Sequence, residues 1–411
     1  MNYQIEDVFS PRSFPQNTYI SRKLDDGETV DDRLKRALSM KGNLIFVTGA
    51  SKSGKTVLCH NVISSESYIA LSGNQISTKA DFWNHIAEQL PLSDAVVLTT
   101  GEQNSNNKGS QAELKLNLGI AGLGASINSN TGNNMNQQLA VTNNRTERQI
   151  IRYLIDNNKV LVLDDFHYIA ADMQMYIART LKTELFNGLK AVIISLPHRS
   201  DEAIICNPDL IGRTTSIEIL PWSAEELRAI AVKGFALLGL QIGEAEERLL
   251  AQESIASPQL MQENCFQLAF ASVQKQLAIQ PDLVRYAFRQ TARNYAHYER
   301  LVQAIRQGPA QGIGRRKSYL LQDGAVDIYQ LLLLALKADP PVTELSLGAL
   351  KERLRQLLYT QATPSSSVIS AALNKIIKIV AELMPDLDAL EYKNQCLYIL
   401  DPFLLFYLRW K

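Results

Sequence analysis

The octapeptide GASKSGKT at residues 49–56 constrains the fold more than any other part of the chain, because it has the spacing G-x-x-x-x-G-K-T. Residues 43–50, NLIFVTGA, are typical of a buried strand, and residues 55–63, KTVLCHNVI, have helical spacing. A glycine-rich loop between a strand and a helix lets successive backbone N–H groups and the helix N-terminus face one point in space. The sequence therefore predicts a strand, a phosphate-binding loop and a helix.

The side chains of this loop indicate which ligand it takes. Lys55 would place a positive charge toward the β and γ phosphates of a nucleoside triphosphate, and the Thr56 hydroxyl would bind Mg2+. The residues expected to surround the nucleotide belong to the loop and the first helical turn: Gly49, Ser51, Lys52, Ser53, Gly54, Lys55, Thr56 and Val57. A nucleotide and Mg2+ are therefore the predicted cofactors.

A second motif is KVLVLDD at residues 159–165, a buried strand that ends in two carboxylates. An acidic pair after a strand is usually a turn signal, but downstream of a phosphate-binding loop it predicts a site beside that loop. Asp164 would hold Mg2+, directly or through water, and Asp165 would orient or deprotonate the attacking water. His167 either packs in the following turn or senses the γ-phosphate.

Two later segments offer further polar groups. After the strand at 191–195, Ser195, His198 and Arg199 are candidates for reading the γ-phosphate, although Arg199 fits a solvated loop equally well. Arg213 precedes the last strand and is a candidate arginine finger for the nucleotide of a neighbouring subunit. The alternative for Arg213 is a surface ion pair.

The order of the elements predicts an α/β fold. Strands at 67–72, 160–165, 191–195 and 216–220 alternate with helical patterns, which indicates a five-stranded parallel sheet covered on both faces. One strand is expected between the strand of the phosphate loop and the acidic strand. The Asn-, Ser- and Gly-rich insertion at 101–144 predicts a β-hairpin in flexible flanks, serving either as a tolerated surface insertion or as a partner contact.

The remaining regions give the domain organisation. Residues 1–40 are expected to form an extended arm and a helix, and residues 41–220 the α/β core. After Pro221 the strands stop, and successive helical patterns predict a helical bundle over 221–306. Residues 307–411 contain a linker, three helices and a hairpin-like strand pair, which predicts a winged helix.

Composition excludes several classes of protein. The 42 basic and 42 acidic residues give a formal net charge of +0, so no global positive field indicates a nucleic-acid or membrane partner. The four cysteines are scattered without a C-x-x-C pair, which favours reduced buried thiols. No apolar run approaches the roughly 20 residues of a membrane span, and no secretory leader is evident. A cytoplasmic location without membrane contact is therefore expected.

The motifs together resemble the AAA+ and STAND superclass of P-loop ATPases over residues 15–411. GASKSGKT and VLVLDD are similar to its Walker A and Walker B motifs, and three weaker features add to them. LPHRS resembles the sensor 1 region, GRTTSIEILPWSAEEL resembles the passage from the core into the helical lid, and SPQL at 257–260 resembles the G-x-P element that approaches the nucleotide. The tail LYILDPFLLFYLRW looks like that of related ATPases with a winged helix after the lid.

The resemblance implies further site residues. Pro258 would approach the nucleotide, and the arm before the phosphate loop would line the adenine pocket with Tyr19, Ile20 and Arg22, although simple packing is the more usual role of such arm residues. Two positions depart from the pattern. Ser257 stands where the family often has Gly, and Asp165 replaces the Glu usual in AAA+ enzymes; an Asp is common in the slowly hydrolysing STAND members.

The winged helix allows two roles. In STAND proteins it packs on the nucleotide and holds the inactive state, and Leu373, Ile376, Ile377 and Ile379 would supply the apolar contact face. In a DNA-binding protein its third helix would need more charge than Lys375 and Lys378 provide. The packing role is favoured, although the basic run at 315–317 keeps DNA as an option.

The resemblance implies an ATP-binding, slowly hydrolysing molecular switch that exchanges ATP for ADP, with Mg2+ as the metal. It further implies homo-oligomers formed through the ATPase cores and control of a separate effector protein, because the chain shows no effector segment of its own. Prokaryotic proteins of this type often serve antiviral defence. The alternative is a DNA-binding AAA+ adaptor of the kind that loads helicases or selects transposition targets.

Overall fold

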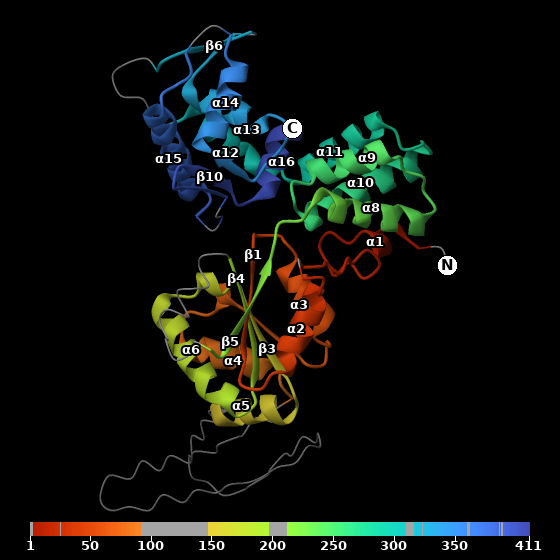
Figure 1. Ribbon diagram of the computed structural model, residues 1–411, viewed down its shortest axis with the longest axis vertical. Coiled ribbons are helices and arrows are strands. Elements are labelled where there is room, and N and C mark those ends of the chain that lie inside the picture. Colours follow the sequence, from red (N-terminus) through yellow and green to blue (C-terminus); the bar gives the residue numbers. More distant parts are fainter. Residues whose placement is uncertain are drawn as a thin grey trace, which may run out of the picture.

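Figure 1 shows the computed structural model of the protein, in which an α/β core lies below two helical regions. The structure describes residues 3–24, 26–91, 147–196, 212–309, 316–322, 324–359, 362–385, 387 and 389–411. The insertion at 101–144, with its expected β-hairpin, lies outside the described residues.

The core contains a five-stranded parallel sheet. Its strands are β1 (Leu44–Gly49), β2 (Tyr68–Ser72), β3 (Val160–Asp164), β4 (Lys190–Ser195) and β5 (Thr214–Ile219). Their spatial order is β2-β3-β4-β1-β5, so β4 lies between the strand of the phosphate loop and the acidic strand. The expected α/β P-loop fold with an interposed strand is confirmed.

Helices cover both faces of this sheet (Figure 1). The helices are α2 (Val30–Ser39), α3 (Lys55–Val62), α4 (Lys79–Glu88), α5 (Glu147–Asp156) and α6 (Ala171–Phe186). Alternate residues of β1 point to opposite faces: Ile45 and Val47 pack with α2 and α3, whereas Leu44 and Phe46 pack with α4, α5 and α6. Two hydrophobic cores therefore hold the sheet in place and fix the strand ends that carry the motifs.

A helical bundle, which we call the lid, follows the sheet after Pro221. It consists of α8 (Ala224–Leu238), α9 (Glu244–Glu253), α10 (Pro258–Lys275) and α11 (Pro281–Asn294). The N-terminal arm, expected to be extended, contains the short helix α1 (Ile5–Val8) and packs on this lid. Its Phe9 ring lies 5.1 Å from the ring of Phe235, and both side chains are buried.

The C-terminal unit begins with α12 (Glu299–Gln307), which packs mainly against its later helices. The other elements are β6 (Tyr319–Leu321), β7 (Gly324–Val326), α13 (Ile328–Lys337), β8 (Glu344–Ser346), α14 (Leu347–Leu357), α15 (Ser366–Leu383), β9 (Leu390–Lys393), β10 (Cys396–Ile399) and α16 (Pro402–Trp410). Strands β8, β10 and β9 form an antiparallel sheet in that order. The three expected helices are α13, α14 and α15, and the expected hairpin is β9–β10; strands β6, β7 and β8 and helices α12 and α16 are additional.

The apolar residues of α15 do not have the role expected from the sequence. Leu373 and Ile376 are buried inside the C-terminal unit's own core, and Ile377 and Ile379 pack against that core. The prediction that these residues face the nucleotide was wrong, because the C-terminal unit buries the apolar stripe of α15 in its own core. Within the described residues, no helix combines the length and apolar character of a membrane span.

Candidate nucleotide site

The phosphate loop joins β1 to α3 and depends on two glycines. Gly54 is the residue before α3 and has φ +95°, in the left-handed region that glycine adopts without strain. At Gly49, a Cβ atom would lie 2.7 Å from the carbonyl oxygen of Ile219 and 2.9 Å from its Cβ. The backbone therefore takes this tight path only with glycine at both positions.

Lys55 is turned back onto the loop that it follows. Its Nζ atom donates to the carbonyl oxygens of Gly49, at 3.0 Å, and Ala50, at 2.7 Å. Burial lowers the pKa of Lys55 to about 8, although the nearby carboxylates of Asp164 and Asp165 favour its charged form. The Lys55 ammonium is thus held by carbonyl groups of its own loop. A bound phosphate group would replace these carbonyl groups as its hydrogen-bond acceptor.

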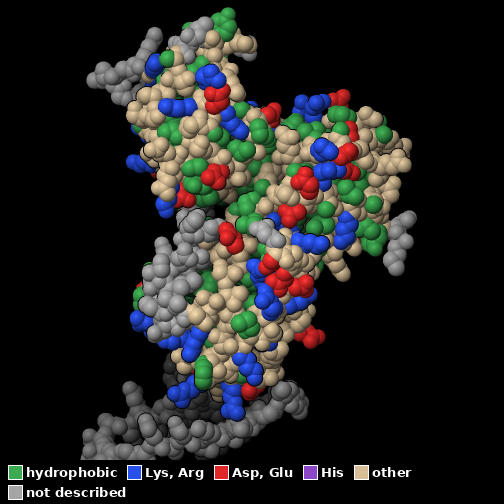
Figure 2. Space-filling model, viewed as in Figure 1, with side chains coloured by type: hydrophobic (Ala, Val, Ile, Leu, Met, Phe, Trp, Pro, Cys, Tyr) green, Lys and Arg blue, Asp and Glu red, His purple; other side chains and the backbone are tan. Residues whose placement is uncertain are grey.

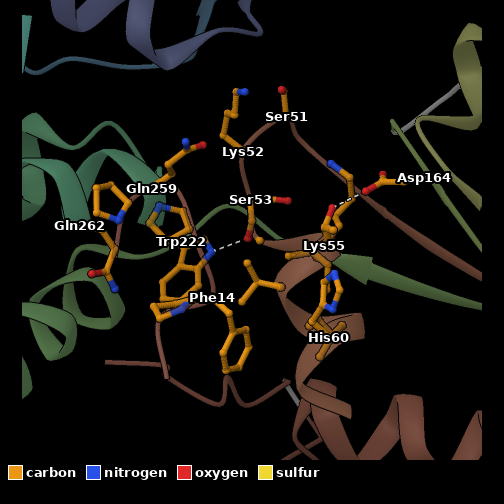
Figure 3. Close-up of a pocket in the computed structure, with 18 of the residues that line it drawn as sticks. Phe14, Ser51, Lys52, Ser53, Lys55, His60, Asp164, Trp222, Gln259 and Gln262 are labelled. Atoms are coloured by element: carbon orange, nitrogen blue, oxygen red, sulfur yellow. Dashed lines mark hydrogen bonds between the residues drawn. The ribbon is translucent and has the colours of Figure 1, made fainter. Parts of the chain in front are cut away.

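Asp164, labelled in Figure 3, lies within hydrogen-bond distance of Thr56, the other predicted Mg2+ ligand. The Thr56 hydroxyl donates to Asp164 Oδ2 at 2.5 Å, and the Asp165 backbone N–H donates to Asp164 Oδ1 at 2.8 Å. Burial raises the pKa of the Asp164 carboxyl. A hydroxyl and a carboxylate are hard oxygen donors that fit Mg2+, which takes few protein ligands and completes its shell with phosphate and water.

A cavity of about 820 Å³ opens in front of the loop. Its walls include the loop and α3, the arm, the ends of β3 and β5, the start of α10 and the C-terminal unit just before α16. Figure 3 shows the loop side of this cavity. The lining includes the predicted residues Tyr19, Arg22, Ser51, Lys52, Ser53, Gly54, Lys55, Thr56, Val57, Asp164, Asp165 and Pro258. This volume lies within the range of roughly 300–1,000 Å³ typical of ligand pockets.

The arm residues line the cavity, but each is also engaged elsewhere. The Tyr19 hydroxyl donates at 2.8 Å to Asp31, a buried residue of α2 that also accepts from Ser21 and Asn61. Burial, followed by this hydrogen bond, raises the pKa of Tyr19. The Arg22 guanidinium forms a two-pronged ion pair with Glu226 of α8, at 2.8 and 3.1 Å. Arg22 therefore fixes the start of the lid rather than presenting a free charge to a ligand.

The other predicted residues have different outcomes. Ser195 lies at the end of β4, where its hydroxyl is buried without a hydrogen-bond partner among the described residues. His198 and Arg199 lie outside the described residues. Arg213 lies at the opposite end of the sheet: its carbonyl oxygen accepts from Leu44, the first residue of β1, and its guanidinium lies 5.9 Å from the Phe186 ring. Arg213 does not line the phosphate-loop cavity of its own chain.

Sequence reasoning missed several residues of this site. Trp222 donates from its indole N–H to the Ser53 carbonyl oxygen at 2.8 Å. The Lys52 ammonium lies 5.8 Å from the centre of the Phe403 ring, and the buried Asp401 also lines the cavity. Trp222 follows the last strand of the parallel sheet, so the sequence offered a signal for it. No local pattern, however, pairs a residue near 52 with one near 403.

Comparisons with known proteins give distant likenesses only. No protein-family model and no curated protein matches the chain. Among solved structures, it is similar to Cdc6p from Pyrobaculum aerophilum (13% identity, 98% of this chain and 97% of that chain, TM-score 0.44). It is also similar to the ORC2 protein of Aeropyrum pernix (14%, 98% and 97%, TM-score 0.47) and to a Walker-type ATPase of Pyrococcus abyssi (11%, 92% and 94%, TM-score 0.47). At this distance, the function has to be argued from the site itself.

Proposed function

We propose that the protein binds ATP with Mg2+ in this cavity and hydrolyses it. The observation that carries the proposal is the Thr56–Asp164 pair at the ends of α3 and β3, beside a buried lysine in a glycine-dependent loop. The loop N–H groups and Lys55 would hold the phosphates, and Thr56 and Asp164 would hold the metal. When bound, Mg2+ neutralises charge that develops on the phosphate oxygens.

Asp165 is the group best placed to act on water. It follows the metal ligand directly, lines the cavity and has φ +55°, which turns the chain sharply after the strand. Its carboxylate would orient the attacking water or accept its proton. Among the described residues, the buried Ser195 hydroxyl at the neighbouring strand end has no hydrogen-bond partner, which supports a role in contacting the γ-phosphate or this water.

We further propose that the ATPase acts as a slow switch. The C-terminal unit, which we assign as a winged helix from its order of helices and strands, contacts the phosphate loop through Phe403 and Lys52. Because the C-terminal unit closes the cavity, its position would depend on whether ATP or ADP is bound there. Three further parts complete this proposal: Arg199 reads the γ-phosphate, Arg213 acts on a neighbour's nucleotide in an assembly formed through the ATPase cores, and the protein controls a separate effector. A role in antiviral defence remains a prediction from family resemblance.

A second candidate function is DNA binding. The main contacts of α15 are with α12, α13 and β9, so the outer face with Asn374, Lys375 and Lys378 is exposed. Figure 2 shows acidic side chains among the basic ones over this unit on the face in view, which argues against strong phosphate binding there. A salt-dependent gel shift of random duplex DNA by the ATP-bound protein would favour this candidate.

The deciding experiment compares nucleotide binding and turnover in matched variants. Lys55→Ala should reduce ATP affinity at least tenfold by calorimetry, whereas Lys41→Ala, on the exposed turn before β1, should leave it unchanged. Asp165→Asn should slow ATP hydrolysis while ATP still binds, with Asp172→Asn on α6 as the control. Unchanged affinity in Lys55→Ala would reject the proposed site. Measurement of particle size with and without ATP then tests assembly.

A further inference from the structure

Trp222 connects the phosphate loop to the start of the lid. It lies between β5 and Ser223, the residue that caps α8, and its indole N–H donates to the Ser53 carbonyl oxygen at 2.8 Å. Figure 3 shows this bond crossing from the ring to the loop. The segment that leads from the core into the lid is therefore attached to the loop that would hold the phosphates.

The other side of Trp222 is held by the arm. The Arg22 guanidinium lies 4.7 Å from the centre of the indole ring, a cation–π distance. The same guanidinium donates to the carbonyl oxygens of Leu220, at 2.8 Å, and Pro221, at 3.2 Å. Arg22 thus fixes the backbone just before Trp222, while its pair with Glu226 fixes the first turn of α8.

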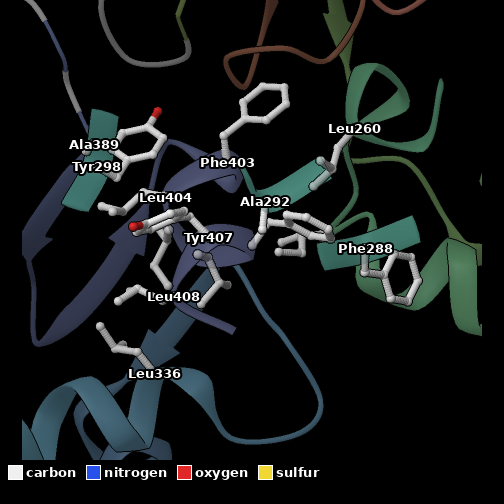
Figure 4. Close-up of a cluster of buried hydrophobic side chains, with 14 of the residues drawn as sticks. Leu260, Phe288, Ala292, Tyr298, Leu336, Ala389, Phe403, Leu404, Tyr407 and Leu408 are labelled. Atoms are coloured by element: carbon white, nitrogen blue, oxygen red, sulfur yellow. The ribbon is translucent and has the colours of Figure 1, made fainter. Parts of the chain in front are cut away.

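The lid and the C-terminal unit form one body beyond this point. A single hydrophobic cluster runs through both, and in Figure 4 the labelled side chains of α16 lie between those of the lid and those of the C-terminal unit. At the far end of α16, Arg409 and Trp410 bind the buried Glu253 of α9; the Arg409–Glu253 contacts are 2.9 and 2.5 Å, and the Trp410 contact is 2.6 Å. The sheet has its own separate cores. Motion is therefore easier between the sheet and this body than within the body.

The hydrogen bonds within the phosphate loop must change when a phosphate group binds. The Ser53 N–H currently donates to the Ala50 carbonyl oxygen at 3.3 Å, and the Lys55 ammonium occupies two loop carbonyls. A phosphate group needs these same donors, so its binding replaces bonds within the loop. The Ser53 carbonyl oxygen accepts the hydrogen bond from Trp222, and it belongs to the segment that rearranges.

We propose that Trp222 is a positioning residue that transmits the state of the phosphate loop to the body formed by the lid and the C-terminal unit. This inference rests on the proposed nucleotide binding and adds the route by which binding moves the rest of the chain. Rearrangement of the loop displaces the Ser53 carbonyl, the indole follows, and the body turns about the segment 220–223. The contact between Lys52 and Phe403 on the opposite wall of the cavity then opens.

The test combines tryptophan fluorescence with small-angle X-ray scattering at saturating ATP and Mg2+. Trp222→Phe keeps an aromatic ring over Arg22 and removes the N–H donor. Trp83→Phe is the matched control, because it also removes one indole bond, to Tyr176 at 2.9 Å, far from the cavity lining. Saturation of each variant is first established by calorimetry.

We expect ATP to shift the emission of the wild-type protein and of Trp83→Phe, and Trp222→Phe to lose most of that shift. The ATP-induced change in scattering should also be at least halved in Trp222→Phe and retained in Trp83→Phe. If ATP binds but the two variants respond alike, the inference is overturned and the proposed function stands. If calorimetry detects no ATP binding to the wild-type protein, both are overturned.

Discussion

The Thr56 hydroxyl lies 2.5 Å from Asp164 Oδ2, which joins the first turn of α3 to the end of β3. The two residues are more than one hundred positions apart in sequence, yet the strands that lead to them, β1 and β3, end at the same edge of the sheet on either side of β4. The fold itself therefore brings together the two residues that we propose as Mg2+ donors.

We expect Asp164→Asn to abolish the dependence of ATP binding on Mg2+ without lowering the melting temperature of the nucleotide-free protein. Burial raises the pKa of this carboxyl, so the fold favours the protonated form and the charged form at pH 7 destabilises it. Scanning calorimetry and Mg2+ titrations check the two effects. Asp172→Asn is the control, and a clear fall in the melting temperature of Asp164→Asn alone would contradict this reasoning.

Nucleotide binding should take up protons near pH 8. The folded-state pKa of Lys55 is lowered to about 8 from 10.5, so a sizeable fraction of this lysine is neutral there, and a bound phosphate would favour the charged form. For the same reason, Lys55 destabilises the nucleotide-free fold below about pH 8, and this effect disappears as the pH rises toward 10.5. Calorimetry in buffers of different ionisation enthalpy measures the uptake. A signal that grows toward pH 6 instead would identify phosphate groups as its source.

We expect loss of the buried ion pair between α9 and α16 to cause a large decrease in the free energy of unfolding of the body formed by the lid and the C-terminal unit. Glu253→Gln leaves the Arg409 guanidinium buried with reduced compensation, and loss of one partner of such a pair costs about 3–5 kcal/mol. Glu244→Gln removes an exposed partner of Arg248 and should cost about 1 kcal/mol or less. Denaturant unfolding followed by tryptophan fluorescence distinguishes the two; equal effects would show that burial does not strengthen the Glu253 contact.

Gly234→Ala should release the arm from the lid. A Cβ atom at residue 234 would lie 2.3 Å from the Phe9 ring, which is fully buried and has no room to shift. Limited proteolysis should then cut the arm faster than in the wild-type protein. Gly348→Ala, in α14, meets nothing closer than 3.9 Å and serves as the control. An arm that stays protected in Gly234→Ala would mean that Phe9 adapts.

The sequence predicted the parts of the fold that local patterns encode. The five strands, the phosphate loop and the Asp164–Thr56 pair follow from an apolar run, a glycine spacing and the rule that parallel strand ends meet at one edge. Contacts that close the cavity from a distance were not predictable. Phe403 reaches Lys52 only because α16 is held between two helical regions, and no spacing in the chain encodes that contact.

The role of apolar residues also depends on neighbours that a single sequence does not reveal. The stripe on α15 was correctly identified as apolar, yet Leu373 and Ile376 are used inside the C-terminal unit. Arg22 was expected beside the nucleotide and does line the cavity, but its charge is paired with Glu226. In both cases residue type was predictable, whereas the partner was decided by tertiary packing.

The cavity wall contributed by Asp401 lies more than 340 positions after the phosphate loop in the sequence. During translation, at roughly 5–20 residues per second, the phosphate loop would leave the ribosome on the order of twenty seconds to a minute before that wall does. A nascent chain with a folded sheet would therefore meet nucleotide through an open loop, and only a chain that has also folded α16 could trap it. Ribosome-bound chains that stop before α16 should release nucleotide faster than chains that include it.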